Sequence, residues 1–170
     1  MRLPLGRRRG QAAIEYALSW VTLVLPLITM IIFASQLMWV WHSVVDYTRE
    51  GARYAATHCY QPGGTNVLQF MRDNVPLMAD QQQFREGQAE ITVSYFSRNA
   101  DTGLLEEFAC DGSDCSKDCI PDVVRVSVAG YQYRGGFSYF GLQPISLPNF
   151  STSMPMESAG CSPDTEDCLP

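Results

Sequence analysis

The chain has 170 residues and a formal net charge of −6, with 46% hydrophobic side chains. Four arginines fall within the first ten residues, so residues 11–170 alone hold 8 basic and 18 acidic side chains and carry a charge of −10. An acidic body of this kind repels nucleic acid and anionic headgroups, so we expect no nucleic-acid partner. The length allows one membrane segment and one modest folded domain.

A long apolar run follows the basic leader, residues 1–10. Residues 16–45 contain no charge, and residues 17–41 are almost wholly apolar. About 20 helical residues cross the hydrocarbon core of a bilayer, so we predict a membrane segment at about 16–41, with Trp39, Trp41 and Tyr47 near its far interface. Pro26 removes one backbone hydrogen bond and is expected to kink the helix without ending it.

The helical pattern continues past the membrane segment to about residue 58. Small and apolar side chains recur at helical spacing at Val44, Thr48, Ala52, Ala55 and Ala56. Asp46 and Arg49 are three residues apart, near enough to pair on an exposed face, and the same holds for Glu50 and Arg53. We therefore predict a single long helix over residues 11–58.

The charges that flank the run predict its direction. The arginine cluster lies on the N-terminal flank, whereas the charges on the other flank balance, so the positive-inside rule places the N-terminus in the cytoplasm and the chain after about residue 45 outside. The six cysteines all follow the run: Cys59, Cys110, Cys115, Cys119, Cys161 and Cys168. An even number on one side of a membrane segment indicates an oxidising compartment and disulfides. The alternative, free or metal-binding thiols, is disfavoured because the chain has no C-x-x-C pair.

Glu15 is the only formal charge between residues 12 and 45, and a carboxylate within hydrocarbon is costly. A secretory signal peptide is one interpretation, but the apolar run continues past the only small-residue cleavage site, near Ala34 and Ser35. An uncleaved signal anchor is the second interpretation, and it is compatible with Glu15 only if this residue lies near the inner membrane interface.

Cleavage between Gly10 and Gln11 is the third interpretation, and it gives the carboxylate a use. Glu15 would then lie in the first turn of the helix, where the helix dipole favours an acid. In a staggered bundle, Glu15 of one chain would meet the Gln11 amine of the next. The pair would set the register, since any other stagger leaves both ions unpaired in a low dielectric.

The stretch "RRRGQAAIEYA" resembles the prepilin leader of the type IV pilin superfamily, in the Flp-type pattern of a glycine, four residues and then Glu-Tyr. The following stretch, which ends in "DYTREGARYAATHC", is similar to the TadE-like family of pseudopilins of the tight adherence (Tad) system. The resemblance covers about residues 6–60 and is architectural beyond them. It implies that a prepilin peptidase cleaves after Gly10 and that Glu15 and Tyr16 serve recognition or assembly.

By this resemblance the chain is a minor pilin or pseudopilin, a structural protein and not an enzyme, in the assembly of a bacterial Tad or Flp pilus. The implied partners are a prepilin peptidase, other pilin subunits, the Tad inner-membrane platform and inner-membrane lipid, with no cofactor. The implied location is the bacterial inner membrane, with a single pass, a cytoplasmic N-terminus and a periplasmic C-terminal domain. After assembly the implied location is an extracellular pilus, with a role in cell adhesion.

Residues 59–170 are expected to form a disulfide-containing α+β domain. Pro62 and the glycines after it end the long helix, and residues 65–75 predict a short helix. Its apolar face is formed by Val67, Leu68, Met71 and Val75. Residues 76–88 predict a helix end and a loop, whereas "AEITVSYF" and "DVVRVSVAGYQYR" predict strands. A third strand at about 146–154 is confined to a sheet edge by Pro148. The expected fold is therefore a long membrane-spanning helix followed by a short helix and a small antiparallel sheet.

The segment "CDGSDCSKDC" lies between the predicted strands. Its Asp111, Asp114 and Asp118 suggest calcium, but their spacing does not follow an EF-hand loop, so we interpret the segment as a solvated, disulfide-pinned loop. Cys161 and Cys168 are consistent with a local bridge.

No catalytic constellation is found in the sequence. His42 and His58 have no serine or cysteine partner in a recognisable motif, and the chain has no phosphate loop, dinucleotide fingerprint or H-E-x-x-H. We therefore expect neither catalysis nor a metal site. The alternative function is an uncleaved, signal-anchored periplasmic or surface module whose disulfide-rich domain binds a surface, a sugar or a metal.

Overall fold

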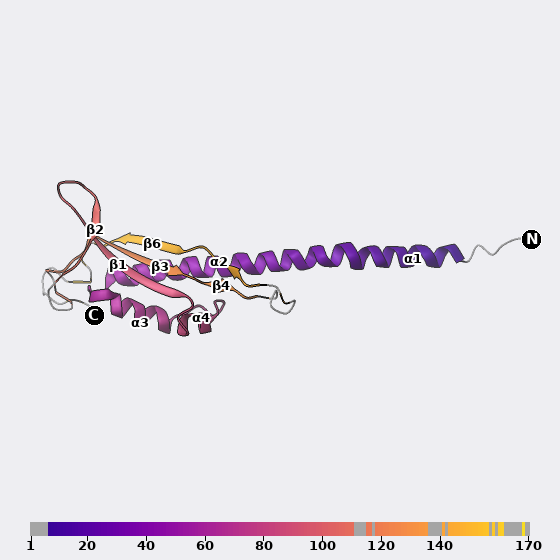
Figure 1. The fold of residues 1–170 in the computed structure, drawn as a ribbon, viewed down its shortest axis with the longest axis horizontal. Coiled ribbons are helices and arrows are strands. Elements are labelled where there is room, and N and C mark those ends of the chain that lie inside the picture. Colours follow the sequence, from indigo (N-terminus) through magenta and orange to yellow (C-terminus); the bar gives the residue numbers. More distant parts are fainter. Residues whose placement is uncertain are drawn as a thin grey trace, which may run out of the picture. The chain divides into compact units, whose positions relative to one another are not determined.

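The structure is a computed structural model that describes residues 7–110, 115–116, 118–135, 141, 143–156, 158, 160–161 and 168. The chain divides into two compact units between Met38 and Trp39. The first holds most of the N-terminal helix, and the second holds the remaining elements together with the last turns of that helix (Figure 1).

The N-terminal helix is continuous and contains one π-helical turn. It is an α-helix over α1 (Arg7–Ser19), a π-helix over η1 (Trp20–Val24) and again an α-helix over α2 (Leu25–Thr57). At the end of η1, the Leu25 N–H donates to the Trp20 carbonyl five residues earlier. Pro26 follows at once, and its ring would crowd the carbonyl four residues before it, so the wider turn gives the ring room. The predicted long helix is confirmed, and the π-helical turn lies directly before the proline.

The stretch Gly10–Thr57 is long and apolar enough to cross a membrane, and none of its 18 most apolar consecutive residues is buried. Large side chains along it are exposed, including Ile14 at 70% and Leu23 at 70%. Apolar surface on this scale calls for a lipid or protein environment. The helix could therefore serve as a membrane anchor.

The second unit is built around a four-stranded antiparallel sheet in the order β2-β1-β3-β6. Its strands are β1 (Glu90–Arg98), β2 (Leu105–Glu107), β3 (Val123–Ala129) and β6 (Phe150–Pro155). A second, two-stranded sheet pairs β4 (Gln132–Tyr133) with β5 (Ile145–Ser146). β6 is an edge strand, as predicted, although Pro148, on which that prediction rested, lies just before it; β2 forms the other edge.

One face of the sheet is apolar and the other is polar. Val93 lies opposite Val126 and Ile91 opposite Val128 across the β1–β3 pair, so these side chains share a face. Val126 and Val128 are fully buried, whereas Arg125 on the other face is exposed. This alternation is typical of an antiparallel sheet with one face in the core and one in water.

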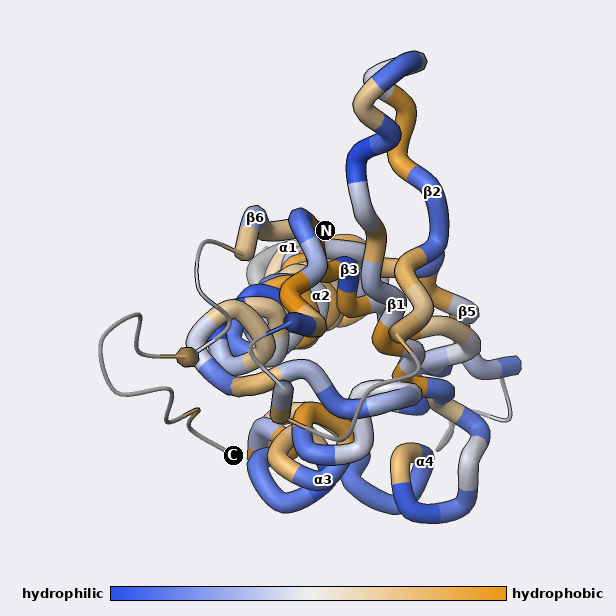
Figure 2. Tube along the Cα trace, turned by 90° about the vertical axis from the view of Figure 1, so that its left-hand side faces the viewer, coloured by the Kyte–Doolittle hydropathy of each residue, from blue (hydrophilic) through white to orange (hydrophobic). Residues whose placement is uncertain are grey.

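Helices cover the apolar face. Figure 2 shows α3 (Thr65–Asp73) and α4 (Gln81–Arg85) beside α2. The Trp41 ring of α2 packs edge-on against Phe150 of β6 with centroids 4.9 Å apart, and the Phe84 ring of α4 lies 5.7 Å from that of Tyr131. The architecture is α+β, as predicted.

The region predicted as helix end and loop contains one more helix. α4 begins after Asp80, whose side chain accepts a hydrogen bond from the Gln82 N–H and caps the helix. Gln83 is fully buried, and its amide bonds both backbone groups of Gln132, at 2.7 Å to the carbonyl and 2.9 Å from the N–H. The buried amide thus stabilises a helix that its own sequence favours weakly.

Candidate functional site

The residues that the sequence assigned to processing and assembly all lie on α1. Gly10, Gln11, Glu15 and Tyr16 are exposed, and the Gly10–Gln11 bond lies within the helix. The Gln11 Nε2 atom donates to the Glu15 carboxylate at 3.2 Å, one turn away. The ring of Tyr16 makes an edge contact with Trp20, at 6.4 Å between centroids. The helix therefore places Gln11 and Glu15 on one face, beside an otherwise apolar surface.

The hydroxyl groups of the apolar helix are satisfied by the helix itself. Each donates to a backbone carbonyl four residues earlier: Ser19 to Glu15, Thr22 to Leu18, Thr29 to Leu25 and Ser35 to Ile31. Bonds of this kind remove the cost of placing a hydroxyl in lipid or in a helix bundle. Glu15 is the only formal charge between residues 12 and 45, and the Gln11 amide is the hydrogen-bond partner of its carboxylate among the described residues.

The "REGARYAA" segment lies in the part of α2 that belongs to the second unit. Gly51, Ala52 and Ala55 are buried, and a Cβ added to Gly51 would lie 2.6 Å from the Met71 sulfur of α3. Small side chains therefore let α3 lie close against α2. Arg49 is exposed and bonds Asp46 at 3.1 Å, as the spacing predicted, although an ion pair this exposed adds little stability.

Tyr47 and Thr48, just before this segment, tie the helix to the rest of the unit. The Tyr47 hydroxyl donates to the Met71 carbonyl, and the Thr48 hydroxyl lies 3.0 Å from that of Thr152 on β6. Tyr47 is only 3% exposed, so its predicted place at the membrane interface is wrong; it belongs to the core of the second unit. Trp39, by contrast, remains 64% exposed.

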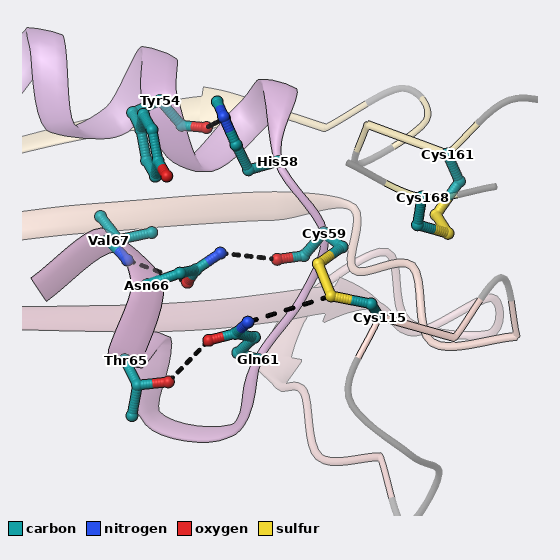
Figure 3. The surroundings of a disulfide bond; sticks show 10 residues. All are labelled: Tyr54, His58, Cys59, Gln61, Thr65, Asn66, Val67, Cys115, Cys161 and Cys168. Atoms are coloured by element: carbon teal, nitrogen blue, oxygen red, sulfur yellow. Dashed lines mark hydrogen bonds between the residues drawn. A yellow bond between two sulfur atoms is a disulfide. The ribbon is translucent and has the colours of Figure 1, made fainter. Parts of the chain in front are cut away.

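The six cysteines form three pairs: Cys59–Cys115, Cys110–Cys119 and Cys161–Cys168. The last is the local bridge considered in the sequence. The first links the end of the long helix to a segment 56 residues later (Figure 3). Around it, Asn66 donates to the Cys59 carbonyl at 3.1 Å, and the Cys115 N–H donates to the Tyr60 carbonyl at 3.1 Å. The end of α2 is therefore held by covalent and polar contacts together.

Neither histidine has the surroundings of a catalytic base. His42 is exposed. The His58 Nδ1 atom lies 2.8 Å from the Tyr54 carbonyl, and its ring stacks on that of Tyr54 at 3.7 Å. Within the described residues no group of three or more His, Cys, Asp or Glu could hold a metal ion. Asp118 is exposed, and Asp111 and Asp114 lie outside the described residues.

The clear pKa shifts among the described residues belong to buried tyrosines. Burial raises the pKa of Tyr95 from 10.0 to about 12, and burial likewise raises the pKa of Tyr131. The Tyr95 hydroxyl is buried without a hydrogen-bond partner among the described residues. Because these shifts lead away from neutral pH, the tyrosines are unsuited to proton transfer there.

Comparison with family models matches residues 10–53 to the family described as TadE-like protein. The matched segment runs from the predicted cleavage site through α1, η1 and α2 to Arg53, and the match confirms the family resemblance found in the sequence. No match is found among curated proteins or solved structures. The match suggests a protein associated with a Tad pilus, from a family that is typically structural.

Proposed function

We propose that this chain, whose residues 10–53 match the TadE-like family, is a minor pilin or pseudopilin that takes part in assembling a Tad or Flp pilus. The observation that carries the proposal is the family match on a continuous, exposed apolar helix, Gly10–Thr57, whose last turns enter a small α+β unit. This layout suits a subunit that is held in a membrane and packs against other subunits through its helix.

The leader suits processing by a prepilin peptidase. In this proposal the peptidase cleaves the bond between Gly10 and Gln11 on the cytoplasmic side of the inner membrane. A Cβ added to Gly10 would meet no atom within 4 Å, so the bond lies on an open part of the helix. The arginines before it favour a cytoplasmic N-terminus, and the three cysteine pairs favour an oxidising periplasm for the second unit.

Assembly then depends on Glu15. Its carboxylate is exposed beside the apolar side chains of Ile14 and Leu18, so packing helices together removes water from it. A buried carboxylate without a partner is strongly destabilising, whereas one beside an amine is compensated. Cleavage creates that amine at Gln11, and the neighbouring subunit supplies it when the two helices are correctly staggered.

Piliation tests the proposal as a whole. Deleting the gene for this chain from its own bacterium should abolish or sharply reduce surface pili seen by electron microscopy, and restoring the gene should recover them. A normal number of pili in the deletion strain would contradict the proposal.

A further inference from the structure

A cavity of about 360 Å³ lies in the second unit between α2 and α3. Tyr54 of α2 lines it together with residues of α3 and its C-terminal cap: Asn66, Gln69, Phe70, Asp73 and Asn74. Its volume is within the range of roughly 300 to 1,000 Å³ that small-molecule sites occupy. The cavity is independent of the residues that the proposed pilus function uses.

The aromatic part of the cavity is pre-organised. The Tyr54 and Phe70 rings stack with centroids 4.1 Å apart and an angle of 6° between their planes. His58 also stacks on Tyr54, at 3.7 Å and 17°, and its bond to the Tyr54 carbonyl fixes the imidazole (Figure 3). A stack of this kind loses little freedom when a ligand packs against it.

Some polar side chains that line the cavity already make hydrogen bonds within the protein, and others do not. Asn66 is used on both sides of its amide, since Nδ2 donates to the Cys59 carbonyl and Oδ1 accepts from the Val67 N–H. The Asn74 amide donates one N–H at 2.8 Å to the Phe70 carbonyl, which leaves its Oδ1 available. Gln69 and Asp73 are exposed, and neither side chain makes a hydrogen bond to another described residue. The cavity therefore offers amide N–H donors and several acceptors beside an aromatic ring.

This combination matches the chemistry of a sugar ring. A pyranose has an apolar C–H face that packs on an aromatic ring, and hydroxyls at its edge that both donate and accept hydrogen bonds. An anion would be repelled by Asp73, whereas a ring that carries several hydroxyls can bond Gln69, Asp73 and Asn74 together. Because Phe70 and His58 stack on opposite faces of Tyr54, Tyr54 supports Phe70 from behind. We propose that the cavity binds a neutral saccharide, with Phe70 contacting the ring and with Gln69, Asp73 and Asn74 bonding its hydroxyls.

The test uses the full chain in lipid nanodiscs, because common glucoside and maltoside detergents would compete for the site. Saturation-transfer NMR and calorimetric titration with two probes, maltotriose and the trimer of N-acetylglucosamine, should detect binding of at least one. The double variant Gln69→Ala/Asp73→Asn should bind that probe at least about tenfold more weakly, because it removes the hydrogen bonds of the Gln69 amide and the charge of the Asp73 carboxylate.

The matched control makes the same two chemical changes elsewhere in the unit, as Gln82→Ala/Asp101→Asn; both positions are exposed and lie away from the cavity. The control should bind like the unchanged chain. Failure of both saccharides to bind, equal binding by the cavity variant, or binding of phosphocholine in place of a saccharide would each overturn the assignment.

Discussion

Gly51 of α2 lies against the side chain of Met71 on α3, so closely that a Cβ on the glycine would come within 2.6 Å of the sulfur. Met71 is fully buried, and its carbonyl accepts the hydrogen bond from Tyr47. Gly51 falls within the residues that match the TadE-like family, whereas Met71 lies beyond them. A small residue in the matched helix therefore allows the domain that follows it to pack closely against the helix.

Gly51→Leu should destabilise the second unit. A larger side chain must push Met71 out of a packed position, and overpacking of this kind costs about 1 to 3 kcal/mol. The expected result is a lower midpoint of thermal unfolding, followed by circular dichroism of the full chain in nanodiscs. The neighbouring change Glu50→Leu, at an exposed position, serves as control. Equal midpoints for the two variants would show that the contact does not limit packing.

The Cys59–Cys115 bridge should contribute more stability than the Cys161–Cys168 bridge. The first closes a loop with a sequence separation of 56 and the second one of 7, and a bridge restricts the unfolded chain more when its loop is longer. Replacing both cysteines of the first pair by serine should cost about 2 to 5 kcal/mol. The same replacement in the second pair is the matched control and should cost less. Urea unfolding measures both, and the reverse order would contradict the prediction.

The elements with a strong repeating pattern could be predicted from the sequence. Alternating valines predicted β3, and the apolar run predicted the long helix. β2 has only three residues, all exposed, and so carries no alternation of burial to detect. α4 was missed because it depends on the buried Gln83, whose two bonds to Gln132 reach 49 residues along the chain.

The candidate sites also differ in how far they could be predicted from the sequence. Gly10, Gln11 and Glu15 stand out because a motif is local in sequence. The cavity between α2 and α3 does not, since Tyr54 and Phe70 meet only after the chain turns back at Gly63 and Gly64, both of which adopt positive φ. The Cys59–Cys115 pair likewise depends on contacts that form only in the folded unit, since 56 residues separate the two cysteines. Motifs formed by neighbouring residues could be predicted from the sequence, whereas contacts between residues far apart in the chain are visible only in the folded structure.

Tyr95 should make the stability of the second unit depend on alkaline pH. Its pKa is about 12 in the folded chain against 10.0 for the unperturbed group, so the folded state keeps the proton that the unfolded state loses. This contribution is complete below about pH 10 and declines as the pH rises toward 12. Tyr95→Phe should weaken the fall of the unfolding midpoint measured from about pH 9 to 11. The hydroxyl has no partner among the described residues, so its removal should not lower stability at pH 7. Superimposable pH curves would contradict the assignment.

Cleavage after Gly10 should leave Gln11 as the first residue of the mature chain. Mass spectrometry of protein extracted from membranes of piliated cells measures this directly, and an otherwise identical strain without the prepilin peptidase should retain the leader. An intact Met1 in cells that possess the peptidase would contradict processing. It would favour the alternative, an uncleaved anchor that presents the second unit as a binding module.

Glu15→Ala should separate processing from assembly. The cleavage site is unchanged, so mass spectrometry should still find Gln11 at the N-terminus, but the variant should be largely absent from purified pili and accumulate in the membrane. The reason is electrostatic, because without the carboxylate the Gln11 amine of a packed neighbour has no partner in a low dielectric. Glu15→Asp keeps the charge and should restore part of the incorporation, whereas Ser19→Ala, one turn further along the same face, should behave as the unchanged chain. Normal incorporation of Glu15→Ala would show that the carboxylate does not set the register.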